Sequence, residues 1–274
     1  EELCQMLQIC GAMGEDDAVH VLRTAASRQR VFTEFESGSA TRSEIQDALG
    51  VSRSTAFRVV NSFESLGLIS RQNGAYELTS FGHVVHRETA RATDTIRTAN
   101  RLSPLLGALE ETEESLELSA FTDATITEIE SGDPYRPMRR FLSLIEDASR
   151  IREFAPTPPD PAYQNTLYDR VSDGLCAAVL YPPSVVDRIR QQDDGEFERV
   201  IEEEALHVRV GDPPAFRLVV TDERIYVGGY NDDASFLQVV ADTADPDVQE
   251  WATRSFETHW ERATPFDAYV EAVR

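Results

Sequence analysis

The stretch GVSRSTAFRVV, residues 50–60, decides the fold expected for the first third of the chain. Each residue of an α-helix advances by about 100°, so a helix from about Arg53 to Leu66 gathers its apolar residues on one side. That side holds Ala56, Val59, Val60, Phe63 and Leu66. The opposite side holds Ser54, Arg58, Asn61 and Ser65. These polar side chains can donate to base edges and phosphates, so the pattern is typical of a helix that reads DNA.

The residues before this helix predict a shorter partner helix. In TRSEIQDALG, residues 41–50, Thr41 and Glu44 have the spacing of a capping box. Its apolar side would be formed by Ile45, Ala48 and Leu49. Gly50 suits the tight turn between the helices, and Ser52 would cap the second helix. Together the two helices predict a helix-turn-helix.

A β-hairpin is expected after the reading helix. In GLISRQNGAYELT, residues 67–79, Asn73-Gly74 separates two strand-like runs, which is the strongest two-residue hairpin signal. We therefore predict a winged helix-turn-helix domain in residues 1–79. Its predicted DNA-binding residues are Arg42, Ser52, Arg53, Ser54, Thr55, Arg58, Asn61, Arg71, Gln72 and Asn73. A winged helix can also bind another protein, and this remains an alternative.

Helices are predicted on both sides of this motif. Apolar spacing in residues 17–36 predicts two helices that are broken near Ser27. Residues 80–110 are expected to be a linker, with a long helix over about residues 80–101 that also forms a dimer. Its thin apolar stripe is Val84, Val85, Thr89, Ala92, Ile96, Ala99 and Leu102. His83 and His86 lack a further ligand at metal-binding spacing, so no metal site is predicted.

The charge of the chain is strongly negative. Its 49 acidic residues oppose 26 basic residues, all of them arginine, for a net charge of -23. An acidic surface without lysine suggests a salt-rich cytoplasm, where a Debye length of about 3 Å at molar salt weakens repulsion of DNA. The charge is also uneven: residues 23–101 hold 11 Arg and 8 acids, whereas residues 102–274 hold 15 Arg and 36 acids.

Other sequence features exclude several classes of protein. The three cysteines, Cys4, Cys10 and Cys176, form no ligand spacing, and the acidic start lacks the basic region of a signal peptide. No apolar run approaches the ~18 residues needed to span a bilayer. No catalytic triad order, phosphate-binding loop or dinucleotide fingerprint is present. We expect a cytoplasmic protein without a cofactor, a membrane contact or an enzymatic activity.

The remainder of the chain alternates strand-like and helix-like segments. SLELSAF, residues 115–121, is expected to be the first strand, and a closing helix is expected to start at Pro246 with an apolar side of Ala252, Phe256, Trp260 and Ala263. This alternation predicts an α/β sheet domain in residues 111–274. The whole chain is therefore predicted to be α+β.

The sequence resembles haloarchaeal winged-helix transcriptional regulators whose C-terminal half is a domain of the methanogenesis-regulatory-protein type. The segments that carry the resemblance are ASRQRVFTEF, GVSRSTAFRVVNSFESLGLI, YELTSFG, DGLCAAVLYPPSVVDRI, RLVVTDERIYVGGYNDD and WATRSFETHWERATP. The resemblance implies a regulator that binds double-stranded promoter DNA, forms a homodimer and has a C-terminal domain for an effector or signal.

One segment is also distantly similar to the phospholipase D superfamily. In AFRLVVTDERIYVGGYND, residues 215–232, placing Asp222 on that family's aspartate puts Ala215 where the nucleophilic histidine should be and Arg217 where the lysine should be. Without the imidazole, covalent phosphoryl transfer has no nucleophile. Arg217 with Gly228 and Gly229 could still bind an anion, although Arg217 could instead be an exposed strand residue paired with an acid. The candidate ligand-binding residues are Arg217, Asp222 and Tyr230.

Two further features have open interpretations. The proline-rich stretch REFAPTPPDPAYQ, residues 152–164, could place Phe154 and Tyr163 at the rim of a pocket, or it could be a surface loop. His207 on an alternating strand is expected to face solvent or form a hydrogen bond.

The leading hypothesis is a sequence-specific transcriptional regulator with a possible small-molecule or anionic effector. The alternatives are a phosphodiesterase with a DNA-binding module and a protein-interaction adaptor.

Overall fold

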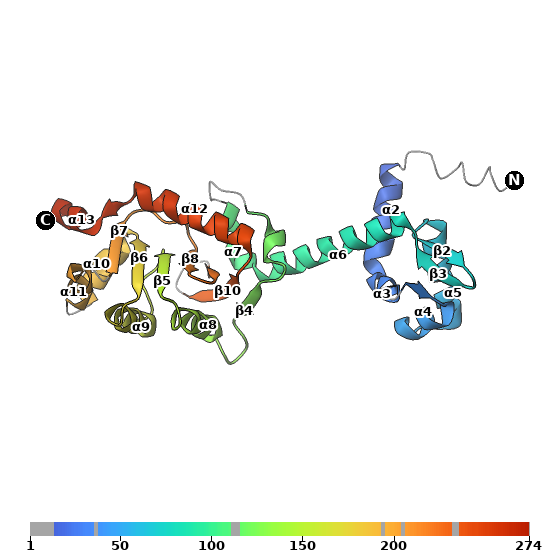
Figure 1. Cartoon of the computed structure of the whole chain (residues 1–274), viewed down its shortest axis with the longest axis horizontal. Helices are drawn as coiled ribbons and strands as arrows, with labels where there is room; N and C mark the ends of the chain where they lie inside the picture. Colours follow the sequence, from blue (N-terminus) through green and yellow to red (C-terminus); the bar gives the residue numbers. More distant parts are fainter. Residues whose placement is uncertain are drawn as a thin grey trace. The chain divides into compact units, whose positions relative to one another are not determined.

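The computed structural model describes residues 14–35, 38–110, 116–192, 195–203, 206–231 and 236–273. The chain divides into two compact units, with the boundary between Ile96 and Arg97 (Figure 1). This boundary lies inside the helix that we expected to link the domains. Cys4 and Cys10 lie outside the described residues.

The first unit has helices followed by a small antiparallel sheet. Its elements are α2 (Glu15–Ser27), α3 (Gln29–Thr33), β1 (Ser39–Ala40), α4 (Arg42–Leu49), α5 (Arg53–Ser65), β2 (Ile69–Gln72), β3 (Ala75–Leu78) and the start of α6 (Ser80–Arg101). The three strands are arranged in the order β1-β3-β2. The two helices predicted before and after the turn, the break after Ser27 and the hairpin are all present.

Local hydrogen bonds explain where these elements begin and end. At the start of α4, Thr41 and Glu44 form both bonds of the predicted capping box. Gly50 has a φ of 60°, a left-handed conformation that glycine adopts without strain. At the hairpin, Asn73 and Gly74 have φ values of 50° and 89°, as the predicted two-residue turn requires.

The core of the first unit is formed by the predicted apolar sides of α4 and α5. Ala56, Val59, Val60 and Phe63 are buried, and Phe63 packs against Phe32 of α3 with ring centroids 5.2 Å apart. On α4, Ile45 is buried but Ala48 is exposed, so the expected apolar side of this helix is narrower than predicted. Gly82 of α6 lies against the carbonyl of Leu68, where a Cβ would be 1.9 Å from the oxygen.

One side of α6 packs on the first unit. The ring of His86 stacks on Phe32 with centroids 4.7 Å apart, and Nε2 of Gln29 donates to Oγ1 of Thr93 at 3.1 Å. Along the predicted apolar stripe, Thr89 and Leu102 are buried, Val85 and Ala99 are half-buried, and Val84, Ala92 and Ile96 are exposed. The stripe is therefore divided between internal packing and solvent.

The second unit is a mixed sheet covered by helices. Before the sheet and along it lie α7 (Ser103–Glu110), η2 (Leu118–Phe121), β4 (Thr125–Glu128), α8 (Arg136–Ile145), β5 (Arg150–Phe154), α9 (Pro161–Ser172), β6 (Cys176–Tyr181), α10 (Pro183–Gln192) and α11 (Glu196–Glu202). The remaining elements are β7 (Leu206–Val210), β8 (Arg217–Thr221), β9 (Ile225–Tyr230), β10 (Leu237–Thr243), α12 (Pro246–Arg262), β11 (Thr264–Pro265) and α13 (Phe266–Val273).

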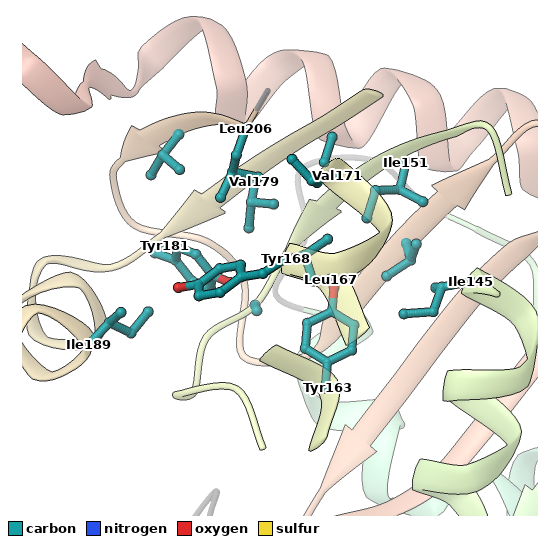
Figure 2. Packing of buried hydrophobic residues seen from close by; sticks show 14 of the residues in the cluster. Ile145, Ile151, Tyr163, Leu167, Tyr168, Val171, Val179, Tyr181, Ile189 and Leu206 are labelled. Carbon is teal, nitrogen blue, oxygen red and sulfur yellow. The ribbon is translucent and has the colours of Figure 1, made fainter. Parts of the chain in front are cut away.

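Within the described residues, the sheet has the strand order β11-β7-β6-β5-β8-β9-β10-β4. β5 pairs with β6 and β6 with β7 in parallel, while β8, β9, β10 and β4 are antiparallel to their neighbours. One apolar cluster packs α8, α9, α10 and α11 on one face of the sheet; Figure 2 shows part of it around Tyr163, Leu167 and Val179. A second cluster packs α7, η2 and α12 on the other face. The predicted α+β class is confirmed.

Three expectations for this unit were wrong or incomplete. Residues 118–121 form a 3₁₀ helix instead of part of a strand, and its Phe121 is buried under α12 in the second cluster. β4 and α11 were not expected from the sequence; both are short, with alternating or charged sequences that give weak periodic signals. Ala263 is buried as expected, but it is the C-cap residue that follows α12 and is not part of the helix itself.

Candidate functional site

The outward side of α5 is a polar surface. Arg53, Ser54, Arg58 and Asn61 are exposed along it, as predicted. The side chains of Arg58 and Asn61 form no hydrogen bond or ion pair with another residue in the described part of the chain. Their donors therefore need no internal bond to be broken before they meet a ligand. Arginine and asparagine can each form paired hydrogen bonds with guanine and adenine, respectively.

The start of α5 contains a small network of hydroxyl groups. The Ser52 hydroxyl accepts from the backbone N–H of Thr55 at 3.3 Å, and it lies 3.0 Å from the hydroxyls of both Ser54 and Thr55. Ser52 thus holds the first turn of the helix. The free backbone N–H groups of a first turn and its positive dipole favour a nearby phosphate.

A cavity of about 340 Å³ lies beside the same helix, between α2 and α5. Its lining includes Arg28, Thr24 and Ser27 next to Arg58 and Thr55. Arg28 is exposed and was not among the predicted DNA-binding residues. Because Arg28 follows α2 in the sequence, only folding brings it to the same cavity as Arg58. The two arginines give this cavity beside α5 two positive charges.

The hairpin places the other predicted residues at its tip. Arg71 and Gln72 end β2, and Asn73 occupies the turn; all three are exposed. Gln72 is paired with Ala75 across the two strands, so the tip is a short, defined loop. Phe57 is an unpredicted feature of α5, because 46 % of this apolar residue is exposed.

Arg42 has a different environment from the other predicted contacts. It is half-buried, its guanidinium lies 4.8 Å from the centroid of the Phe57 ring, and its Nη2 donates to the Tyr76 hydroxyl at 2.8 Å. These contacts join α4, α5 and β3. In this position Arg42 contributes to the packing of the domain and holds Phe57 on the outer side of α5.

The residues predicted to bind a ligand do not form one site. Arg217 is only 1 % exposed at the start of β8, and its Nε donates to Oε1 of Glu153 at 2.7 Å. The expectation of an exposed strand residue was wrong, although the pairing with an acid is present. Burial is the largest single effect and works to lower the pKa of Arg217. The Glu153 carboxylate and the neighbouring Tyr230, Tyr163 and Tyr181 together outweigh burial, so this pKa lies well above its ordinary value.

Asp222 follows the other end of β8. It accepts from the Ser149 hydroxyl and from the backbone N–H groups of Ser149 and Arg150, at 2.9 and 3.0 Å. These bonds hold the pKa of Asp222 below its ordinary value, the Ser149 hydroxyl having the largest effect. Asp222 therefore fixes the start of β5, and the grouping of Asp222 with Arg217 in one site was wrong.

Tyr230 does lie beside Arg217. Both residues line a cavity of about 140 Å³, together with Pro134, Tyr135, Met138, Thr157, Pro158, Asp160, Phe236 and Leu237. The proline-rich stretch contributes to this rim through Thr157, Pro158 and Asp160. Phe154 and Tyr163, for which a pocket rim and a surface loop were the two expectations, are instead fully buried in the two apolar clusters. Phe154 is the last residue of β5, and Tyr163 lies on the side of α9 that packs against the sheet.

The paired glycines of β9 are packing positions. A Cβ on Gly228 would be 2.8 Å from Leu237, and one on Gly229 would be 2.8 Å from Leu105 of α7. Both glycines are buried, so the hypothesis that their backbone binds an anion was wrong. His207 is exposed on β7, which is the solvent-facing environment of the two that were predicted for it.

No group of three or more potential metal ligands is present in the part of the chain that the structure describes. None of the helices described has both the length and the apolar character needed to cross a membrane.

Two protein-family models match the chain. Residues 134–262 match the middle domain of the methanogenesis regulatory protein FilR1. Residues 16–101 match the HVO_A0261 N-terminal domain. The first match covers most of the second unit, and the second covers most of the first unit and all of α6. A search of curated proteins found no match.

Three solved structures show remote similarity to the chain. The archaeal chromatin protein TrmBL2 has 14% identity and a TM-score of 0.43, with 87% of this chain and 93% of that chain covered. Nuc, a phospholipase D family member from Salmonella typhimurium, has 12% identity and a TM-score of 0.41, with 53% and 99% covered. NucT from Helicobacter pylori gives the same values. Because all three TM-scores are below 0.5, these similarities assign neither a fold nor a function.

Proposed function

We propose that the protein is a sequence-specific, DNA-binding transcriptional regulator. The observation that carries this proposal is the exposed side of α5, on which Arg58 and Asn61 have no internal partner. In this proposal the first unit is a winged helix-turn-helix: α5 enters the major groove and the β2–β3 tip contacts the adjacent backbone. The match to the middle domain of a regulatory protein supports the same function.

The contacts divide into two kinds. Arg58 and Asn61 read base edges, while Arg28, Arg53, the hydroxyls of Ser52, Ser54 and Thr55, and the tip residues Arg71, Gln72 and Asn73 position the protein on phosphates. Arg42 acts indirectly through its contact with Phe57. At molar salt the net charge of -23 opposes this binding less, because long-range repulsion is then screened within about 3 Å. We infer a halophilic source for the same reason.

The protein is further proposed to act as a homodimer. Val84 and Ile96 of α6 are 47% and 69% exposed, and Val19 and Leu22 of α2 are 58% and 52% exposed. Exposed apolar side chains on helices of one unit favour association with a second copy. Light scattering in molar KCl should give the mass of two chains. An Ile96→Arg substitution should lower the measured mass to the mass of one chain. The dimer would be contradicted if the wild type itself had the mass of one chain.

The second unit is proposed to receive a signal without catalysing a reaction. Ala215 stands where the phospholipase D superfamily has its nucleophilic histidine, so the phosphodiesterase alternative lacks its attacking group. The cavity beside Arg217 is the candidate place for an effector.

Selection from a random duplex library in 2 M KCl tests the DNA-reading assignment. The wild type should enrich one motif, and binding to it should weaken about 5- to 150-fold in Arg58→Ala, since a paired base contact contributes about 1–3 kcal/mol. Arg254→Ala, which removes an exposed arginine from α12, is the control of equal charge change. Failure to enrich any motif, or equal affinity of the two variants, would favour the protein-interaction adaptor.

A further inference from the structure

Two buried polar groups of residues that line the cavity at the carboxyl end of β5 form no hydrogen bond in the described part of the chain. Nη2 of Arg217 and the hydroxyl of Tyr230 are both buried and bond to no atom in the described part of the chain. Both residues line the cavity. Nη2 also lies 2.5 Å from Oε1 of Glu153, an ion-pair contact that lacks hydrogen-bond geometry. A buried donor without a hydrogen bond is costly. Nη2 keeps its ion pair with Glu153, so the Tyr230 hydroxyl and the second N–H of Nη2 are the groups that a ligand would satisfy.

The charges around the cavity limit what this ligand can be. Glu153 already neutralises Arg217 at 2.7 Å, and it also accepts from the Tyr163 hydroxyl. Asp160 adds a carboxylate at the rim, where its Oδ1 accepts from the backbone N–H of Ala162 at 2.8 Å. Arg217, Glu153 and Asp160 together carry a net charge of about -1 at neutral pH. An anion would add a second unbalanced charge, whereas an uncharged acceptor would satisfy both donors.

The shape and walls of the cavity add a second restriction. Its volume of about 140 Å³ is well below the ~300–1,000 Å³ of pockets for drug-sized molecules. Most of the wall is apolar, and the rings of Tyr135 and Phe236 meet edge to face with centroids 6.0 Å apart. Such a wall suits a single ring or a short branched chain.

We propose that this cavity binds a small, uncharged molecule with a carbonyl or hydroxyl oxygen and an apolar body. The oxygen accepts from Nη2 of Arg217 and bonds to the Tyr230 hydroxyl, and the body packs on Met138, Phe236 and Leu237. This ligand extends the effector role proposed for the second unit. Its binding is measured without DNA, so its failure and the failure of the DNA-reading assignment are distinguishable.

Calorimetric titration of the full chain in 2 M KCl with benzamide, and with benzoate of nearly the same shape, tests the proposal. Benzamide should bind, and benzoate should bind at least about tenfold more weakly because its charge is unbalanced in the cavity. Tyr230→Phe should weaken benzamide binding about two- to tenfold, the effect of one hydrogen bond. Thr157→Trp, which places a large side chain at the rim, should abolish it.

Tyr226→Phe is the matched control. The Tyr226 hydroxyl is also buried without a partner on β9, but it does not line the cavity. This variant should bind benzamide as the wild type does, and circular dichroism should show that all variants fold. The proposal is overturned if the wild type does not bind benzamide, or if benzoate binds as tightly. It is equally overturned if Thr157→Trp keeps wild-type affinity, or if Tyr230→Phe and Tyr226→Phe bind equally.

Discussion

The buried guanidinium of Arg217 is held by Glu153, whose Oε1 accepts from Nε at 2.7 Å although 64 positions separate the two residues. Glu153 lies on β5 and Arg217 on the neighbouring β8, so the pair joins two antiparallel strands. The rings of Phe141 and Tyr163 each lie 4.4 Å from the guanidinium carbon. The pair fixes the floor of the cavity at the end of β5.

Glu153→Gln should destabilise the second unit. The substitution leaves the Arg217 charge buried without a counter-charge, for which a loss of about 3–5 kcal/mol in the free energy of unfolding is typical. Urea denaturation in molar KCl, followed by fluorescence of Trp251 and Trp260, measures this loss. Glu257→Gln is the control, because Glu257 forms an exposed ion pair with Arg152 at 3.4 Å and should change stability by less than about 1 kcal/mol. Equal losses in both variants would contradict a structural role of the buried pair.

Gly82→Ala should destabilise the first unit. The added Cβ would lie 1.9 Å from the Leu68 carbonyl oxygen, which the backbone cannot accommodate without moving α6 away from β2. Overpacking of this kind costs about 1–3 kcal/mol, and more where the backbone cannot move. Hydrogen exchange of the β2 and α6 amides measures the loss. Gly107→Ala on α7 is the control, because no atom lies within 4 Å of its added Cβ. Unchanged exchange in Gly82→Ala would show that this close approach is absent.

Asp222 should make the second unit sensitive to acid. Its pKa is held below 3.8, chiefly by the Ser149 hydroxyl, so the carboxylate stabilises the fold above that pH. The contribution is lost as the pH falls through the lowered pKa of the folded state. Thermal unfolding between pH 2.5 and 6 should therefore show a smaller acid-induced fall in Tm for Asp222→Asn than for the wild type. Parallel curves for the two proteins would contradict the prediction.

Short-range patterns made the first unit predictable. The capping box at Thr41, the cap at Ser52 and the turn at Asn73-Gly74 depend on residues close in sequence, and each formed as expected. The exposed side of α5 followed from its helical period. Arg28 was missed because its place next to Arg58 depends on how α2 packs, which no local pattern encodes.

Long-range pairing limited what could be predicted for the second unit. The strand sequence around Arg217 was recognised, but its burial depends on Glu153 from β5 and on rings from α8 and α9. Asp222 and Arg217 are five positions apart, and the length of β8 separates them. The cavity brings together four distant segments. Arg217, Tyr230 and the proline-rich stretch were each singled out in advance, but no local pattern placed them in one cavity.

Chromatin occupancy in cells grown at their native salt concentration tests the central claim most directly. Tagged wild type, an Arg58→Ala, Asn61→Ala variant and the Arg254→Ala control should be compared at equal protein levels. We expect discrete promoter peaks for the wild type and the control, and loss of those peaks in the double variant. A wild type without peaks, or a double variant that keeps all of them, would contradict the assignment of α5 as the helix that reads DNA.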